Sequence, residues 1–166
     1  MASSTGFPPS RERRQITRKN PLDLPPVYLV LSMVAMAVLH FGFPIAQPIR
    51  EPYRYAGAVL IALAAVLGFW AVALFRGART GVVPFSEATT LVTGGPYRVT
   101  RNPMYLAMAG ILVGTAVWLG SITPWLVLPA FMAIITERFI APEEAMLERT
   151  FGESYARYRA AVRRWL

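Results

Sequence analysis

Four long apolar runs, separated by shorter polar segments, dominate the sequence between residues 26 and 140. The runs lie at about 26–43, 53–75, 103–119 and 122–140. An α-helix needs roughly 20 apolar residues to cross the hydrocarbon core of a bilayer. The pattern therefore predicts four transmembrane helices.

The third and fourth runs are separated only by the turn at Gly120 and Ser121. Two helices joined by so short a turn should run antiparallel, as a hairpin. Gly110 and Gly114 lie four residues apart in the third run, a spacing that lets helices approach closely in a membrane. We therefore expect the third helix to pack tightly against a neighbour.

The segment 142–165 has an amphipathic pattern instead. Its large apolar side chains recur at steps of three or four residues: Leu147, Phe151, Tyr155, Tyr158, Val162 and Trp165. Pro142 can open a helix here, with Glu143 and Glu144 in its first turn, and Gly152 can interrupt it. The predicted fold is thus all-α, an integral membrane helical bundle with four transmembrane helices and a C-terminal amphipathic cytoplasmic helix.

Composition agrees with a membrane protein and narrows its chemistry. Hydrophobic residues make up 55% of the chain and the mean hydropathy is +0.42, values too apolar for an ordinary soluble domain. Cysteine is absent from the sequence, which excludes a disulfide framework, a thiolate nucleophile and a cysteine-based metal site. We expect no metal ion. The glycine-rich motif of soluble dinucleotide pockets is also absent from the sequence.

The net charge of +8 is informative through its placement. Arg and Lys gather in the tail 1–25, in the connection 76–102 and after the fourth run, whereas the opposite side carries only Arg50 and Arg54. The positive-inside rule puts both termini in the cytoplasm, in a multi-pass protein of a bacterial inner membrane. We expect a flexible basic tail over 1–25, a membrane domain over 26–166, and no nucleic-acid partner.

Two polar segments should meet on the cytoplasmic side. The first, 89–105, reads T-T-L-V-T-G-G-P-Y-R-V-T-R-N-P-M-Y and follows a long connection of the kind that is usually functional or disordered. The second, 137–148, reads E-R-F-I-A-P-E-E-A-M-L-E. The helical hairpin brings the end of the first segment close to the second. Charged groups at a membrane boundary are candidates for a functional site.

Both segments carry a resemblance to a known family. The stretches G-P-Y-R-V-T-R-N-P-M-Y and P-E-E-A-M-L-E-R-T-F-G-E-S-Y-A-R-Y resemble the isoprenylcysteine carboxyl methyltransferase and phospholipid methyltransferase superfamily. Its members are integral membrane enzymes that use S-adenosyl-L-methionine. The resemblance covers residues 76–162, and the order and spacing of the two motifs make it specific.

The resemblance implies a site. It places the cofactor between the connection 76–102, the start of the third helix and the acidic pair. The implied cofactor-binding residues are Thr89, Thr90, Leu91, Val92, Tyr97, Asn102, Pro103, Met104, Tyr105, Glu143 and Glu144. Arg101 and Arg138 are the catalytic candidates, with Arg138 near the family's substrate-side arginine. Asn102 stands where the family commonly has histidine, and an amide does not titrate near neutrality, so binding is expected of it rather than proton abstraction.

Methyl transfer from a sulfonium is an aligned displacement, which a pocket at a membrane boundary suits. The resemblance implies a lipophilic methyl acceptor that is reached from the membrane lipid. The most similar known acceptor is the carboxylate of an isoprenylated cysteine. A phospholipid amine or a small molecule stays open as acceptor, as does the oligomeric state. A membrane reductase and a non-enzymatic lipid- or partner-binding protein are the other hypotheses, and cofactor binding separates them from a methyltransferase.

Overall fold

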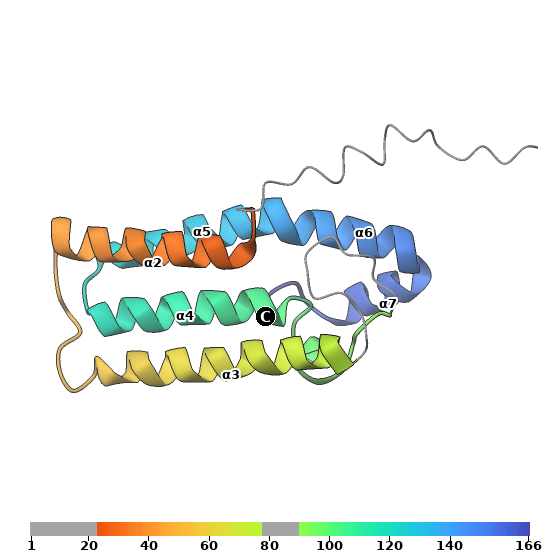
Figure 1. The fold of residues 1–166 in the computed structure, drawn as a ribbon, viewed down its shortest axis with the longest axis horizontal. Coiled ribbons are helices and arrows are strands. Elements are labelled where there is room, and N and C mark those ends of the chain that lie inside the picture. Colours follow the sequence, from red (N-terminus) through yellow and green to blue (C-terminus); the bar gives the residue numbers. More distant parts are fainter. Residues whose placement is uncertain (1–22, 78–89) are drawn as a thin grey trace, which may run out of the picture.

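The computed structural model describes residues 23–77 and 90–166, and within these ranges the regular elements are helices. Four apolar helices lie side by side along the long axis of the bundle (Figure 1): α2 (Pro25–Gly42), α3 (Tyr55–Gly77), α4 (Pro103–Leu119) and α5 (Val127–Ile135). The predicted all-α membrane bundle is confirmed.

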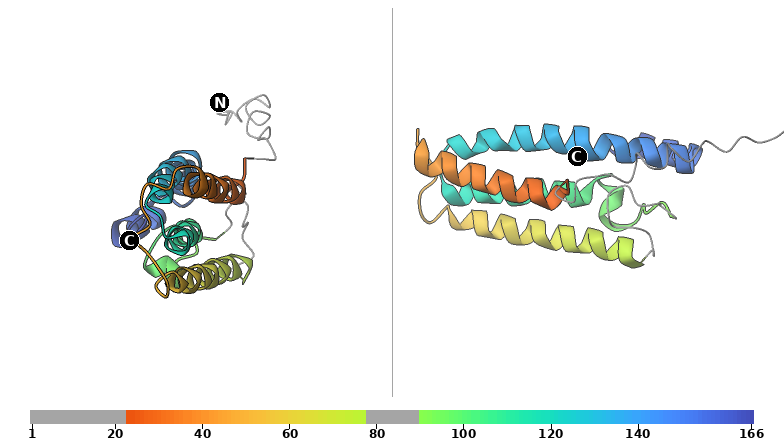
Figure 2. Two further views of the ribbon diagram at one scale, coloured as in Figure 1. Left: turned by 90° about the vertical axis from the view of Figure 1, so that its left-hand side faces the viewer. Right: turned by 45° about the horizontal axis from the view of Figure 1, so that its top comes forward.

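Three helical stretches are long and apolar enough to cross a membrane, namely Pro25–Gly42, Tyr55–Gly77 and Thr123–Phe151. Helix α4 is a shorter apolar helix of 17 residues. It lies between α3 on one side and the pair α2 and α5 on the other (Figures 1 and 2). The outer faces of α2 and α3 expose large apolar side chains such as Leu31, Val34 and Phe69, as expected for surfaces that lipid covers.

The close packing predicted from the glycines of the third helix is present against α3. A Cβ atom added to Gly57 would lie 2.5 Å from the carbonyl oxygen of Gly114, and one added to Gly114 would lie 2.7 Å from the carbonyl oxygen of Gly57. A Cβ on Gly110 would come within 2.9 Å of the Cβ of Ala64. Backbone thus meets backbone where α3 begins and α4 ends, and a Cβ added to Gly68 would lie 3.2 Å from that of Ala107, nearer the start of α4.

On its other side α4 packs against α2 and α5 through fully buried apolar side chains. Met36, Leu112, Phe131 and Ile135 are all at most 2% exposed. The same cluster continues through Phe139 to Tyr105, at the first turn of α4. The core therefore holds the start of α4 in place from both sides.

The fourth apolar run differs from its predicted bounds. It begins with a 3₁₀ turn (Thr123–Leu126), continues through α5, passes a π turn (Thr136–Ile140) and runs without a break into α6 (Ala141–Phe151). Pro142 therefore does not start a separate helix. Because proline lacks an N–H and its ring crowds the preceding turn, the wider π turn just before it lets the helix pass through.

The segment predicted as one helix over 142–165 is likewise divided. Gly152 has φ +49°, a left-handed conformation that ends α6 and favours glycine. Helix α7 (Glu153–Ala161) then turns back, and Val162 continues in extended conformation. The bridge between Thr100 and Arg163 joins the residues after α7 to those before α4. The predicted tail over 1–25 lies almost wholly outside the described residues, as does much of the connection 76–102.

Candidate active site

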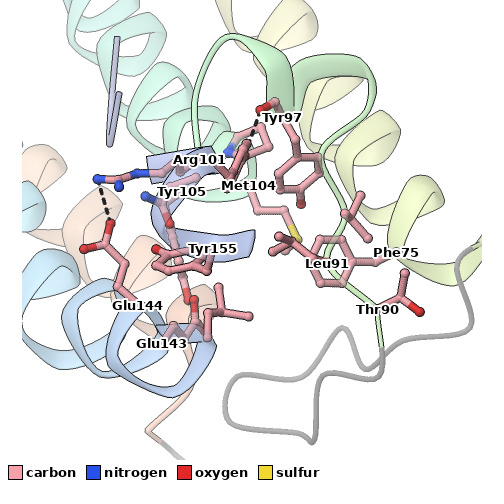
Figure 3. Close-up of a pocket in the computed structure, with 15 residues that line it drawn as sticks. Phe75, Thr90, Leu91, Tyr97, Arg101, Met104, Tyr105, Glu143, Glu144 and Tyr155 are labelled. Atoms are coloured by element: carbon pink, nitrogen blue, oxygen red, sulfur yellow. Dashed lines mark hydrogen bonds and ion pairs between the residues drawn. The ribbon is translucent and has the colours of Figure 1, made fainter. Parts of the chain in front are cut away.

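A pocket lies at the end of the bundle where α4 begins, next to α6 and α7 (Figure 3). Its space, including the open mouth, is about 610 Å³. The lining residues are Phe75, Thr90, Leu91, Val92, Tyr97, Arg101, Asn102, Pro103, Met104, Tyr105, Glu143, Glu144, Leu147, Tyr155 and Tyr158.

The pocket brings together ten of the residues implied to bind the cofactor, along with the catalytic candidate Arg101. The ten are Thr90, Leu91, Val92, Tyr97, Asn102, Pro103, Met104, Tyr105, Glu143 and Glu144. Thr89 lies outside the described residues. Arg138, the other catalytic candidate, does not line the pocket.

A short 3₁₀ helix, η1 (Gly95–Arg98), positions Tyr97. Gly95 has φ +59°, and a Cβ there would lie 2.7 Å from Cδ1 of Leu74, so the turn requires glycine. The ring of Tyr97 packs 5.3 Å from that of Phe75, centroid to centroid, and its carbonyl accepts a 2.7 Å hydrogen bond from the hydroxyl of Tyr158. Tyr97 is thereby fixed at both its ring and its backbone.

Residues 100–102 are held by the extended segment that follows α7. The amide N–H of Arg101 donates to the carbonyl of Arg163 over 2.9 Å. The hydroxyl of Thr100 and the side-chain amide of Asn102 both donate to the carbonyl of Arg164, each over 3.0 Å. The Asn102 amide, which was expected to face the cofactor, thus anchors this segment.

A buried carboxylate joins two arginines at one side of the pocket. Glu144 is 7% exposed and lies 3.1 Å from Nη2 of Arg101. It also accepts hydrogen bonds from Nε and Nη2 of Arg164, over 3.2 and 2.6 Å. A two-point contact of this kind fixes the orientation of both groups. Glu144 therefore connects the start of α4 to the segment after α7.

The second acidic residue has a different partner. Oε1 of Glu143 accepts a 2.8 Å hydrogen bond from the hydroxyl of Tyr105, which is 5% exposed. The ring of Tyr105 lies near that of Phe139, which packs edge-on against Tyr28. The two glutamates of the motif thus serve two separate contacts, one to a tyrosine and one to arginines.

Arg138 lies on the π turn and points away from these contacts. Its side chain is 58% exposed, and its Nη1 donates to the hydroxyl of Tyr28 over 2.5 Å and pairs with Asp23 at 3.3 Å. Its guanidinium lies over the ring of Tyr28, 5.9 Å from the centroid. The structure therefore places Arg138 beside α2 rather than in the pocket.

Sequence reasoning missed five residues of this region, which are Phe75, Leu147, Tyr155, Tyr158 and Arg164. Three of them belong to the apolar stripe of the segment 142–165, which was interpreted as packing. The spacing of that stripe correctly predicted helical structure. It did not show that Gly152 turns the second half of the stripe back toward the pocket.

Four buried polar atoms have no hydrogen-bond partner among the residues that the structure describes: the hydroxyls of Tyr97 and Tyr155, and Nε and Nη1 of Arg101. Burial raises the pKa of Tyr97 far above its ordinary value, and raises the pKa of Tyr155 to about 12. Both phenols therefore remain protonated donors at neutral pH. Buried donors without partners indicate that a ligand or water completes the site.

In the described ranges, no group of three or more His, Cys, Asp or Glu side chains lies close enough to hold a metal ion. The polar groups of the pocket are thus donors, carboxylates and aromatic rings. Such a set is suited to binding and orienting an organic ligand.

Comparison with known proteins identifies the fold and the family. The structure is similar to that of the eukaryotic intramembrane Ras methyltransferase ICMT (isoprenylcysteine carboxyl methyltransferase), with a TM-score of 0.65 and 25% sequence identity. The match covers 85% of this chain and 51% of the other, so the chain spans about half the length of that enzyme.

A curated relative is an uncharacterized protein of Haemophilus influenzae. It is 44% identical over 63 residues, which make up 38% of this chain and all of the relative. A model of the phospholipid methyltransferase family matches residues 53–154, more than half of the chain. The superfamily resemblance found in the sequence is confirmed, and the chain is an integral membrane protein that belongs to the phospholipid methyltransferase family.

Proposed function

We propose that the protein is an S-adenosyl-L-methionine-dependent methyltransferase that acts on a lipophilic acceptor from the membrane. The observation that carries the proposal is the pocket in which both motif segments meet, at the end of an apolar bundle. The membrane methyltransferase domain would comprise residues 26–166.

The residues of the pocket fit the proposed cofactor. Leu91, Val92 and Phe75 offer apolar surface for a purine ring, and the hydroxyl of Tyr97 is a buried donor without a partner among the described residues. The rings of Tyr97 and Tyr105 would attract a sulfonium by cation–π interaction. The carboxylate of Glu143 lies 2.8 Å from the hydroxyl of Tyr105 and adds negative potential near it.

When bound, the cofactor supplies an electrophilic methyl group on a positively charged sulfur. The chain would supply alignment and exclusion of water, which suffice for an in-line displacement. An anionic acceptor and a cationic donor lose charge as they react, so a pocket of low dielectric constant favours the transition state. Arg138 lies outside the pocket, and the proposal gives it no contact with the cofactor.

The lining carboxylates are engaged, Glu143 by the hydroxyl of Tyr105 and Glu144 by Arg101 and Arg164, which favours an acceptor that is already anionic. Tyr97 and Tyr155 stay protonated at neutral pH, and the side-chain amide of Asn102 cannot take up a proton. A carboxylate, such as that of an isoprenylated cysteine, reacts without losing a proton. The amine of a phospholipid is the second candidate, which the family match supports, and it would first have to be deprotonated.

The test uses purified protein in detergent. Titration with S-adenosylhomocysteine in a calorimeter should show binding to the folded protein. Labelled S-adenosyl-L-methionine should then transfer its methyl group to N-acetyl-S-farnesylcysteine as a carboxylate probe, or to phosphatidylethanolamine vesicles as an amine probe. Methyl esters are released by alkali and N-methyl groups are not, which identifies the acceptor. If the folded protein binds no S-adenosylhomocysteine at millimolar concentration, it is not this kind of enzyme, and the non-enzymatic hypothesis replaces it.

We further propose that the pocket faces the cytoplasm of a bacterial cell, since basic residues flank this end of the bundle. The sequence contains no cysteine, so single cysteines report location cleanly. A membrane-impermeant maleimide added to intact cells should label Gln47→Cys, in the loop between α2 and α3, and should label Arg149→Cys on α6 only after lysis. The reverse result would invert the orientation.

A further inference from the structure

The side of the pocket around Glu144 carries an excess of positive charge. Arg101 and Arg164 share this one carboxylate, at 3.1 and 2.6 Å. Two guanidinium groups and one carboxylate leave a net charge of about +1. The side chain of Arg101 is only 9% exposed and that of Arg164 is 42% exposed, so water compensates Arg164 far better than Arg101.

Unpartnered donors lie on the same side. Nε and Nη1 of Arg101 are buried and lack a hydrogen-bond partner within the described ranges, and the same is true of the hydroxyl of Tyr155. Tyr155 is 1% exposed. Figure 3 shows Arg101, Glu144 and Tyr155 together at one side of the pocket, and both Arg101 and Tyr155 line it. Positive charge and three donors are thus present with no acceptor to match them.

We infer that Arg101 and Tyr155 form a carboxylate-binding subsite of the pocket, held in place by Glu144 and Arg164. This inference rests on the proposed function, because it assigns one part of that site. The carboxylate has two possible sources in a methyl transfer of the proposed kind. One is the α-carboxylate of the cofactor's methionine portion, and the other is the carboxylate of the acceptor.

The chemistry favours a carboxylate over a phosphate. Arginine can bind carboxylates and phosphates alike, so the charge of the group decides between them. The local charge of about +1 balances a monoanion. A phosphate dianion would bring a second negative charge close to Glu144, which is held in position by its own two arginines.

Tyr155→Phe is the sharpest variant, because it removes only one oxygen atom. In the described structure that oxygen makes no hydrogen bond, so its loss should leave the melting temperature unchanged or raise it. If the subsite is correct, a ligand with a carboxylate nonetheless loses a donor and binds about tenfold more weakly. Arg101→Lys keeps the charge but not the planar donors, and should weaken the same ligand at least as much.

The measurement compares the binding affinities of two cofactor fragments and KM for one acceptor. S-adenosylhomocysteine carries the α-carboxylate, whereas 5′-methylthioadenosine lacks the whole amino-acid portion. If Tyr155→Phe weakens the binding of S-adenosylhomocysteine about tenfold and leaves the binding of 5′-methylthioadenosine unchanged, the subsite holds the cofactor's carboxylate. If both keep their affinity but KM for N-acetyl-S-farnesylcysteine rises about tenfold, it holds the acceptor's carboxylate.

Arg98→Lys is the matched control for Arg101→Lys, since Arg98 is an exposed arginine of η1 that does not line the pocket. This variant should change neither the affinity for the two cofactor fragments nor KM for N-acetyl-S-farnesylcysteine. The inference is overturned if Tyr155→Phe and Arg101→Lys leave all three quantities unchanged, or if they weaken both cofactor fragments equally. In either case the wild-type protein still binds S-adenosylhomocysteine, so the proposed function survives. Loss of wild-type binding instead refutes the proposed function itself.

Discussion

Replacing Glu144 by alanine is expected to weaken S-adenosylhomocysteine binding at least tenfold and to lower the melting temperature. The side chain of Glu144 is 10% exposed and is the carboxylate contact of both Arg101 and Arg164. Removing one partner of a buried ion pair typically costs about 3–5 kcal/mol, because the remaining charge stays buried. Here the loss would also remove the side-chain link that Glu144 makes between Arg101 and Arg164.

Glu148→Ala is the matched control for this variant. Glu148 lies on the same helix, α6, and pairs with Arg159 at 3.2 Å, but both side chains are 51% exposed. Exposed pairs contribute about 0–1 kcal/mol. The two melting temperatures and the two affinities, measured by fluorescence and calorimetry on purified protein, should therefore differ clearly. Equal behaviour of the two variants would mean that Glu144 does not organise the pocket.

Gly57→Ala should destabilise the protein by disrupting the contact between α3 and α4. The added Cβ would lie 2.5 Å from the carbonyl oxygen of Gly114 and 2.6 Å from the amide nitrogen of Trp118. Both neighbours are backbone atoms, which cannot move aside by a change of rotamer. Overpacking typically costs about 1–3 kcal/mol, occasionally more. Because α4 carries the pocket, affinity for S-adenosylhomocysteine should fall with stability.

The control is Gly42→Ala at the end of α2, where an added Cβ meets no heavy atom of the described residues within 4 Å. Alanine is the better helix former, so this variant should keep or slightly raise the melting temperature. A melting temperature for Gly57→Ala that equals that of Gly42→Ala would show that α3 and α4 separate more easily than their packing indicates.

The sequence was sufficient to predict the bundle and the central part of the site. Apolar runs determine which segments enter a bilayer, because every buried backbone group must be satisfied within a helix. The short turn at Gly120 and Ser121 forces the hairpin, so Asn102 to Tyr105 had to lie near Glu143 and Glu144. Topology alone brings those two segments together.

The position of Arg138 was not predictable in this way. Successive residues of a regular α-helix are turned by about 100°, so a single extra residue redirects every side chain that follows. The π turn over Thr136–Ile140 introduces such a shift. Arg138 contacts Tyr28 and Asp23, outside the pocket, although it lies only five residues before Glu143.

By itself, the sequence determined an integral membrane helical bundle, its family, and a pocket shared by the residues before α4 and the acidic pair. These features follow from local composition and from connections too short to allow alternatives. Only the tertiary structure decided that Gly152 returns Tyr155, Tyr158 and Arg164 to the pocket. It also decided that the Asn102 amide anchors a neighbouring segment, and that Arg101 and Arg164 share Glu144. Such pairings depend on side-chain directions and on contacts between residues 20 to 62 positions apart, which periodicity does not encode.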